Sequence, residues 1–125
     1  MLPQQSRMRR PEDFRRVLRT GRRAGGSVVA GHLLLVGSGP VHSGDPAKVG
    51  FVVSRAVGSA VVRNRVKRRL RELMRRRVAS LPGGCLLVLR AYPAAAHARQ
   101  EDLAADLDLV IGRLLRRQVG ALRQE

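Results

Sequence analysis

The residues with the clearest capacity for chemistry lie between Arg63 and Arg77. Nine of these fifteen residues are arginine or lysine, and Glu72 is the single acid among them. Guanidinium and ammonium groups bind the phosphates of a polyanion when a folded element holds them at regular spacing. The chemistry that this segment predicts is therefore phosphate binding, with nucleic acid as the partner.

The same segment has the pattern of a helix that is attached to a core. An apolar stripe recurs every three or four residues, the spacing of one helix face: Val62, Val66, Leu70 and Leu73. On a helical wheel the cations take the remaining positions: Arg63 at the edge of the stripe, Lys67, Arg68, Arg71 and Arg75 opposite it, and Arg65, Arg69 and Arg76 on one flank. A face that only kept the protein in solution would mix both signs of charge, so we expect polyanion binding. A basic face alone does not distinguish DNA from RNA.

Composition agrees with a folded, nucleic-acid-binding protein. At 125 residues the chain should form one domain, and 44% hydrophobic residues are too many for a disordered chain. Its 25 basic and 9 acidic residues give a net charge of +16, which favours a resident anionic partner. A membrane surface is also anionic, but no segment has the ~18 uninterrupted apolar residues of a membrane helix.

The lack of a recognisable targeting signal and the single cysteine lead us to expect a cytoplasmic protein. Residues 1–10 lack the apolar core of a secretory signal, and Glu12 and Asp13 interrupt the pattern of a transit peptide. The single cysteine, Cys85, excludes an internal disulfide framework, and the apolar run that it begins predicts a buried thiol.

The sequence shows no protein-borne catalytic centre. The three histidines, His32, His42 and His97, are scattered without partners at metal-ligand spacing. No Ser or Cys lies in a recognisable nucleophile motif, and no glycine-rich phosphate loop is present. Aromatic residues that could grip single strands are scarce, and composition alone makes Phe14 a core residue more often than a stacking residue.

The spacing of apolar residues and the positions of glycine and proline predict the helices and strands that position these residues. We expect the following segments: a helix over 11–20 stopped by Gly21, a basic connection with a short edge strand over 22–27, a strand over 28–36, a surface loop over 37–47, a strand over 48–55 antiparallel to the previous one, the basic helix over 58–80 ended by 82–84, a strand over 85–92, and a helix over 100–117. The order is α-β-β-β-α-β-α, which predicts a single two-layer α+β domain spanning 1–125, with about four strands packed by helices and the basic helix in the crossover. Residues 1–8 and 118–125 are expected to be flexible.

One long stretch resembles the bacterial ribonuclease P protein subunit: Gly50-Phe51-Val52-Val53-Ser54-Arg55, Val57-Gly58 and Ala60-Val61-Val62-Arg63-Asn64-Arg65-Val66-Lys67-Arg68-Arg69-Leu70-Arg71-Glu72. That family follows a strand ending near Ser with a Val-Gly-Asn-Ala-Val link and an Arg-Asn-Arg-x-x-Lys-Arg helix, which this chain matches to within one position. The N-terminal residues 7–14 and the strand and helix at the C-terminus also fit, so the resemblance covers nearly the whole chain.

The resemblance implies an RNA-based enzyme, in which a catalytic RNA subunit holds Mg²⁺ and removes the 5′ leader of precursor tRNA. The protein would then carry neither catalytic residues nor a metal of its own, and we expect it as a monomer in the complex. Residues that the family uses to contact the catalytic RNA correspond to Arg63, Asn64, Arg65, Lys67, Arg68 and Arg71. Residues assigned to the leader correspond to Phe14, Leu18, His32, Arg9, Arg10, Ser54 and Arg55.

Three positions depart from the family pattern. Leu18 and His32 occur where aromatic residues are frequent, and Ser59 replaces the frequent Asn before Ala-Val. Imidazole can stack on a base, whereas Leu18 offers only apolar contact. We therefore expect charge to contribute more to leader binding in this chain than in family members with aromatic residues at these positions. Two other hypotheses stay open at this point: a structural RNA-binding protein of the ribosomal type with no role in catalysis, and a DNA-compacting protein.

Overall fold

The structure, a computed structural model, describes residues 2–35 and 46–123, and side chains only as far as residue 116. These residues form three α-helices and four strands: α1 (Pro11–Thr20), β1 (Arg22–Gly25), β2 (Val29–Leu34), β3 (Lys48–Val52), α2 (Ala60–Arg75), β4 (Leu86–Ala91) and α3 (Gln100–Arg123). Short 3₁₀ helices cover Gln4–Ser6, Arg55–Val57, Val78–Ser80 and Pro93–His97. The predicted α+β class and the order α-β-β-β-α-β-α are confirmed.

The four strands form one mixed sheet in the order β1-β2-β4-β3. β2 pairs antiparallel with both β1 and β4, while β3 pairs parallel with β4. α2 connects the two parallel strands, so the basic helix lies in the crossover as predicted. β3 does run opposite to β2, but the two are not neighbours, because β4 lies between them.

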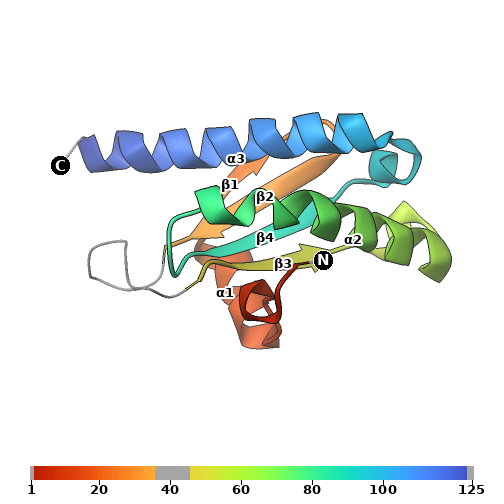
Figure 1. Ribbon diagram of the computed structural model, residues 1–125, viewed down its shortest axis with the longest axis horizontal. Helices are drawn as coiled ribbons and strands as arrows, with labels where there is room; N and C mark the ends of the chain where they lie inside the picture. Colours follow the sequence, from red (N-terminus) through yellow and green to blue (C-terminus); the bar gives the residue numbers. More distant parts are fainter. Residues whose placement is uncertain (1, 36–45, 124–125) are drawn as a thin grey trace.

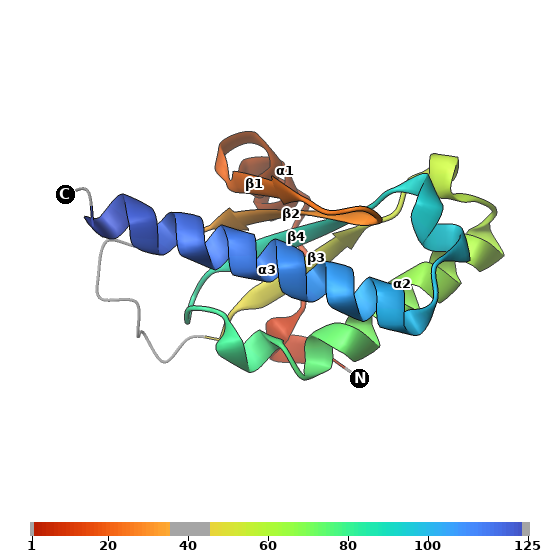
Figure 2. The same cartoon turned by 90° about the horizontal axis from the view of Figure 1, so that it is seen from above.

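Helices lie on both faces of the sheet (Figure 1). α2 and α3 share the larger core with one face, whereas α1 packs with Val17 on Leu86 and Val88 of the other face. Figure 2, seen from the side of α3, shows this helix crossing in front of the strands. α1 therefore adds a short third layer to the two layers that were expected.

Local sequence explains how α2 begins. Gly58 has φ +155°, and a side chain there would lie 3.0 Å from Val62, so this link requires glycine. Ser59 is the N-cap, and its hydroxyl accepts a hydrogen bond from the Val62 N–H at 3.3 Å. Because Asn and Ser are both good N-cap residues, the departure at Ser59 preserves the helix start.

The N-terminal segment packs against β3. Leu2 is 1% exposed and Met8 is 6% exposed, and the Met8 N–H donates to the Val49 carbonyl at 2.9 Å. Arg7 forms a parallel bridge with Val49 at the outer side of β3. Residues 2–8 therefore lie along the open edge of β3, and the expected flexibility of residues 1–8 stays a prediction.

The other end and the long loop were also predicted as irregular. α3 continues to Arg123, past the expected end near residue 117. Most of the predicted surface loop, 37–45, and the last two residues lie outside the described part of the chain.

Candidate nucleic-acid interface

One face of α2 holds the helix to the core. Val66, Leu70 and Met74 are each 0% exposed, and Val62 and Leu73 are partly buried beside them. The predicted apolar stripe is confirmed except at its end, where Met74 rather than Leu73 takes the fully buried position. The spacing of four residues continues the Val66–Leu70 row, and this packing fixes which way every arginine of the helix points.

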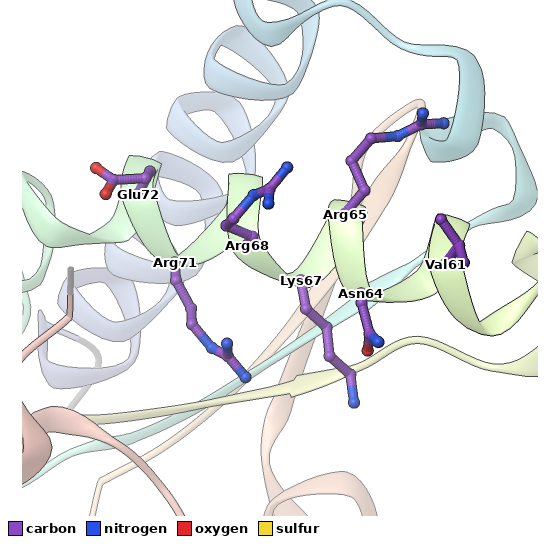
Figure 3. Close-up of a pocket in the computed structure, with 7 residues that line it drawn as sticks. All are labelled: Val61, Asn64, Arg65, Lys67, Arg68, Arg71 and Glu72. Carbon is purple, nitrogen blue, oxygen red and sulfur yellow. The ribbon is translucent and has the colours of Figure 1, made fainter.

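The outward side of α2 presents its cations in two directions (Figure 3). Asn64, Lys67 and Arg71 extend toward the β3 side of the helix, whereas Arg65 and Arg68 point to the other side. A shallow groove of about 580 Å³ runs along this surface and is lined by Val61, Asn64, Arg65, Lys67, Arg68, Arg71 and Glu72. Val61 is 76% exposed, so the groove offers an apolar patch among the charges.

A second hollow, the α1–α2 cleft, lies beside the first. It has a volume of about 310 Å³ and is lined by Arg7, Met8, Arg9, Phe14, Val49, Gly50, Phe51, Lys67 and Arg71. Phe14 from α1 lies directly over Gly50, where a side chain on β3 would collide with its ring. An aromatic ring, glycine backbone and four cations meet here, which suits a single-stranded nucleic acid through stacking and phosphate contacts.

Lys67 and Arg71 line both hollows, which the sequence did not show. Sequence reasoning placed these two side chains only at the catalytic RNA and Phe14 only at the leader, but the structure brings all three to the α1–α2 cleft. It also adds Arg7 and Phe51, which sequence reasoning did not select. Phe51 lies inside the recognised motif, and Arg7 begins the matching N-terminal stretch. The sequence therefore contained a signal that could have identified each residue.

The remaining predicted leader residues do not lie together. Arg9 lines the α1–α2 cleft, and Arg10 is exposed at the residue before α1. Leu18 is 36% exposed on α1 but does not line the cleft.

Beyond the end of β3, Ser54 and Arg55 are exposed, and Arg55 begins the 3₁₀ helix that leads to α2. His32 is 5% exposed in β2, so it is a buried residue rather than an open stacking platform.

Two arginines of the basic segment, Arg69 and Arg77, make structural contacts, and a third, Arg63, is partly buried. Arg63 is half-buried, and its Nε atom has no hydrogen-bond partner among the described residues. Arg69 donates from Nη1 to the Ala98 carbonyl at 3.4 Å. Arg77 holds Asp108 of α3 through Nε at 2.7 Å and Nη2 at 3.2 Å.

Two side chains have shifted pKa values: Asp108 because of its ion pair with Arg77, and Cys85 because of burial. The Arg77 guanidinium lowers the pKa of Asp108 from its usual value. Burial raises the pKa of the Cys85 thiol to about 11, in agreement with the predicted core position. Neither group belongs to the two hollows, whose charged lining residues are cations and Glu72.

Neither a metal centre nor a membrane helix is found in the part of the chain that the structure describes. Over 2–35 and 46–123 there is no group of three or more His, Cys, Asp or Glu side chains that could hold a metal ion. Over the same ranges no helix has the length and apolar character needed to cross a bilayer.

Comparison with known proteins identifies the class to which this fold and surface belong. The family model for ribonuclease P matches residues 2–115. The ribonuclease P protein component of Streptomyces avermitilis is 53% identical over 118 residues, covering 92% of this chain and 96% of that protein. The corresponding protein of a Nocardioides species is 56% identical over 108 residues, covering 86% of this chain and 90% of that protein.

Solved structures agree on the fold. The ribonuclease P protein of Staphylococcus aureus superposes with a TM-score of 0.73 at 19% identity, covering 86% of this chain and 93% of that one. A structure of the Thermotoga maritima protein, in complex with 1-(4-fluorophenyl)-2-thiourea, gives a TM-score of 0.70 at 23% identity over 86% of this chain and 96% of that one. This chain belongs to the ribonuclease P protein family. The sequence left three hypotheses open: a ribonuclease P protein subunit, a ribosomal-type RNA-binding protein and a DNA-compacting protein. Family membership supports the ribonuclease P protein subunit.

Proposed function

We propose that this chain is the protein subunit of an RNA-based ribonuclease P and binds two RNAs at once. The outer side of α2 binds the catalytic RNA, and the α1–α2 cleft binds the single-stranded 5′ leader of precursor tRNA. The observation that carries this proposal is that Lys67 and Arg71 line both hollows. A leader in the cleft would lie directly beside the RNA bound to the outer side of the helix.

Charge neutralisation is the physical contribution of the protein. Two RNAs brought together repel each other through their phosphates, and a protein of net charge +16 reduces that repulsion where they meet. Arg65 and Arg68 supply contacts on the side of α2 away from β3. Arg63 and Asn64 complete the Arg-Asn-Arg motif. We infer that Mg²⁺ and the cleavage chemistry come from the RNA subunit, since the two hollows contain cations and no cluster of carboxylates.

Leader binding combines stacking with phosphate contacts. Phe14 offers a ring at the floor of the cleft, and Arg9, Lys67 and Arg71 surround it with positive charge. Such contacts tolerate many sequences, because every base has a π face and every nucleotide has a phosphate. This suits a protein whose substrates differ in the sequence of the leader. We expect one protein copy in each complex, and we expect the complex in the cytoplasm.

Reconstitution tests the function directly. The purified protein, mixed with its RNA subunit, should restore precursor-tRNA cleavage at a low Mg²⁺ concentration at which the RNA alone is inactive. Absence of stimulation at every ionic strength would reject the proposal. Co-purification supplies a second result: an RNA of a few hundred nucleotides supports it, and whole ribosomal subunits contradict it.

Variants separate the two binding surfaces. Arg65→Ala and Arg68→Ala should weaken binding of the RNA subunit, and each lost phosphate contact should reduce the log–log salt slope by about 0.7–0.9. Phe14→Ala should instead reduce the advantage of precursor over mature tRNA and leave that salt slope unchanged. Arg116→Ala, an exposed arginine on α3, is the matched control and should change neither quantity. Equal effects of Arg65→Ala and Arg116→Ala would show that only net charge matters.

A further inference from the structure

Two neighbouring residues of the groove along α2 carry no charge. Val61 and Asn64 line this groove together with five charged residues: Arg65, Lys67, Arg68, Arg71 and Glu72. The two uncharged residues are three positions apart, a spacing that places side chains next to each other on one helix face. They lie in the first turn and a half of α2, so they form the end of the groove nearest to the start of the helix (Figure 3).

Packing inside the protein does not explain Val61. Its side chain is 76% exposed, compared with 36% for Leu18 and 41% for Leu109, the other large apolar side chains that are exposed in the described part of the chain. The next residue, Val62, makes the contact with the core. Alanine has a higher helix propensity than valine, so helix formation does not favour valine here either. Single exposed apolar residues are common, and it is the position of Val61 in a groove of cations that points to a ligand.

The charged and uncharged lining residues match the two chemical parts of a nucleotide. Arginine and lysine only donate hydrogen bonds, and they bind phosphates next to any base. A base has an apolar face and an edge that carries donors and acceptors. An aliphatic side chain can pack on the face, and an amide, which both donates and accepts, can hydrogen-bond to the edge. Val61 and Asn64 therefore offer the contacts with a base that the cations lack.

A base that makes both contacts must be unpaired. In duplex RNA the bases stack on one another, and the major groove is too deep and narrow for side chains to read their edges. An unpaired nucleotide presents its face and its edge together. The groove has a volume of about 580 Å³, within the range of roughly 300–1,000 Å³ for pockets that hold small ligands. It therefore has room for one such nucleotide.

We propose that Val61 and Asn64 form a base-recognition site for one unpaired nucleotide of the catalytic RNA. The Val61 methyl groups pack on the face of the base, and the Asn64 amide hydrogen-bonds to its edge. Arg65 and Arg68 bind the phosphates of adjoining nucleotides. The site rests on the proposed function, because it assumes that the outer side of α2 binds the catalytic RNA. It deepens that function by giving the helix a means to distinguish the catalytic RNA from other RNAs.

The first experiment compares binding of the full chain to its catalytic RNA and to an unrelated structured RNA of equal length. Val61→Ala should weaken binding of the catalytic RNA about three- to tenfold, the loss expected when about two buried methylene equivalents are removed. Binding of the unrelated RNA and the log–log salt slope should stay unchanged, because no phosphate contact is lost. Asn64→Ala should give the same result. Arg68→Ala should instead weaken binding of both RNAs and reduce the slope.

Matched variants separate apolar contact from shape and from folding. Val61→Thr keeps the branched shape but adds a hydroxyl, so it should weaken binding of the catalytic RNA, whereas Val61→Ile should preserve it. Leu109→Ala removes an exposed apolar side chain of α3 outside both hollows and should change nothing. Val61→Ala should unfold in urea at the same midpoint as the unaltered protein or at a higher one, since alanine has the higher helix propensity.

The second experiment finds the nucleotide itself. Saturating amounts of the unaltered protein should protect one unpaired base of the catalytic RNA from reagents that modify the pairing edge of bases. At saturation Asn64→Ala should leave that base reactive, whereas Arg68→Ala should still protect it.

Three results would overturn the proposal: binding of the catalytic RNA by Val61→Ala as tight as by the unaltered protein, an equal loss for both RNAs, or protection confined to duplex. Failure of the proposed function gives a different result. The unaltered protein would then bind the catalytic RNA no more tightly than the unrelated RNA, and it would not stimulate cleavage.

Discussion

Asp106 is the residue whose replacement should destabilise this fold most clearly. It is 7% exposed on α3, and its carboxylate accepts three backbone hydrogen bonds from the turn before β2 and the first residue of that strand: Ser27 N–H at 2.8 Å, Val28 N–H at 2.9 Å and Val29 N–H at 2.9 Å. The carboxylate also fills the space beside Gly26, where any side chain would collide with it. One side chain therefore attaches the β1–β2 turn to α3.

The contacts set the size of the effect. Hydrogen bonds to a charged group contribute about 1.5–3 kcal/mol each, and an unpaired buried donor costs about 1–3 kcal/mol. The Val29 N–H is buried, while those of Ser27 and Val28 are partly buried and can turn to water. We therefore expect Asp106→Ala to lower the free energy of unfolding by about 3–4 kcal/mol, less than the full sum. Asp106→Asn keeps one acceptor oxygen and should cost about half as much.

Urea unfolding followed by circular dichroism measures this difference. Asp108→Ala is the matched control, because it removes a carboxylate two residues away whose side chain is 63% exposed in its pair with Arg77. An exposed ion pair contributes about 0–1 kcal/mol, so this variant should unfold near the midpoint of the unaltered protein. Equal midpoints for Asp106→Ala and Asp108→Ala would refute the reasoning, since three hydrogen bonds to a buried carboxylate would then be worth no more than one exposed ion pair.

Three further predictions concern the cleft, the core and an ion pair. Gly50→Ala should push the Phe14 ring out of the cleft and reduce the preference for precursor over mature tRNA, with circular dichroism unchanged; an unaltered preference would show that the ring position is not needed. Cys85, which is 0% exposed and has its pKa raised to about 11, should react with a thiol reagent at about pH 8 only after unfolding, and rapid labelling of the native protein would contradict its burial. Arg77→Ala should raise the pKa of Asp108 toward 3.8 in an NMR titration, because the guanidinium that stabilises the carboxylate is gone; its stabilisation is present above that value and is lost as the pH falls through the lowered folded-state pKa.

Most elements of the fold were predictable because their signals are local. The helix over 11–20 has Pro11 in its first turn and Gly21 after its last residue, and its observed bounds agree with the prediction. α2 combines an apolar stripe with the Ser59 cap, and both are properties of neighbouring residues. The run from Cys85 predicted β4 in the same way, to within one residue at each end.

Burial was harder to predict, because it depends on elements far away in the chain. Leu2 looked like part of a free terminus, yet it is buried because residues 2–8 attach to the open edge of β3. His32 looked accessible by comparison with a family position, yet it is buried between β1 and β4. Neither residue differs locally from one that would be exposed.

The sequence by itself determined that α2 is a cationic helix with one apolar face, and that the chain resembles ribonuclease P proteins. Those conclusions rest on spacing along a single helix and on a contiguous motif. The tertiary structure alone decided that β4 lies between β2 and β3. This order accompanies the gathering of Phe14, Lys67 and Arg71 around one cleft. Strand order depends on long-range pairing between segments whose alternating patterns are compatible with several neighbours, so no local signal encodes it.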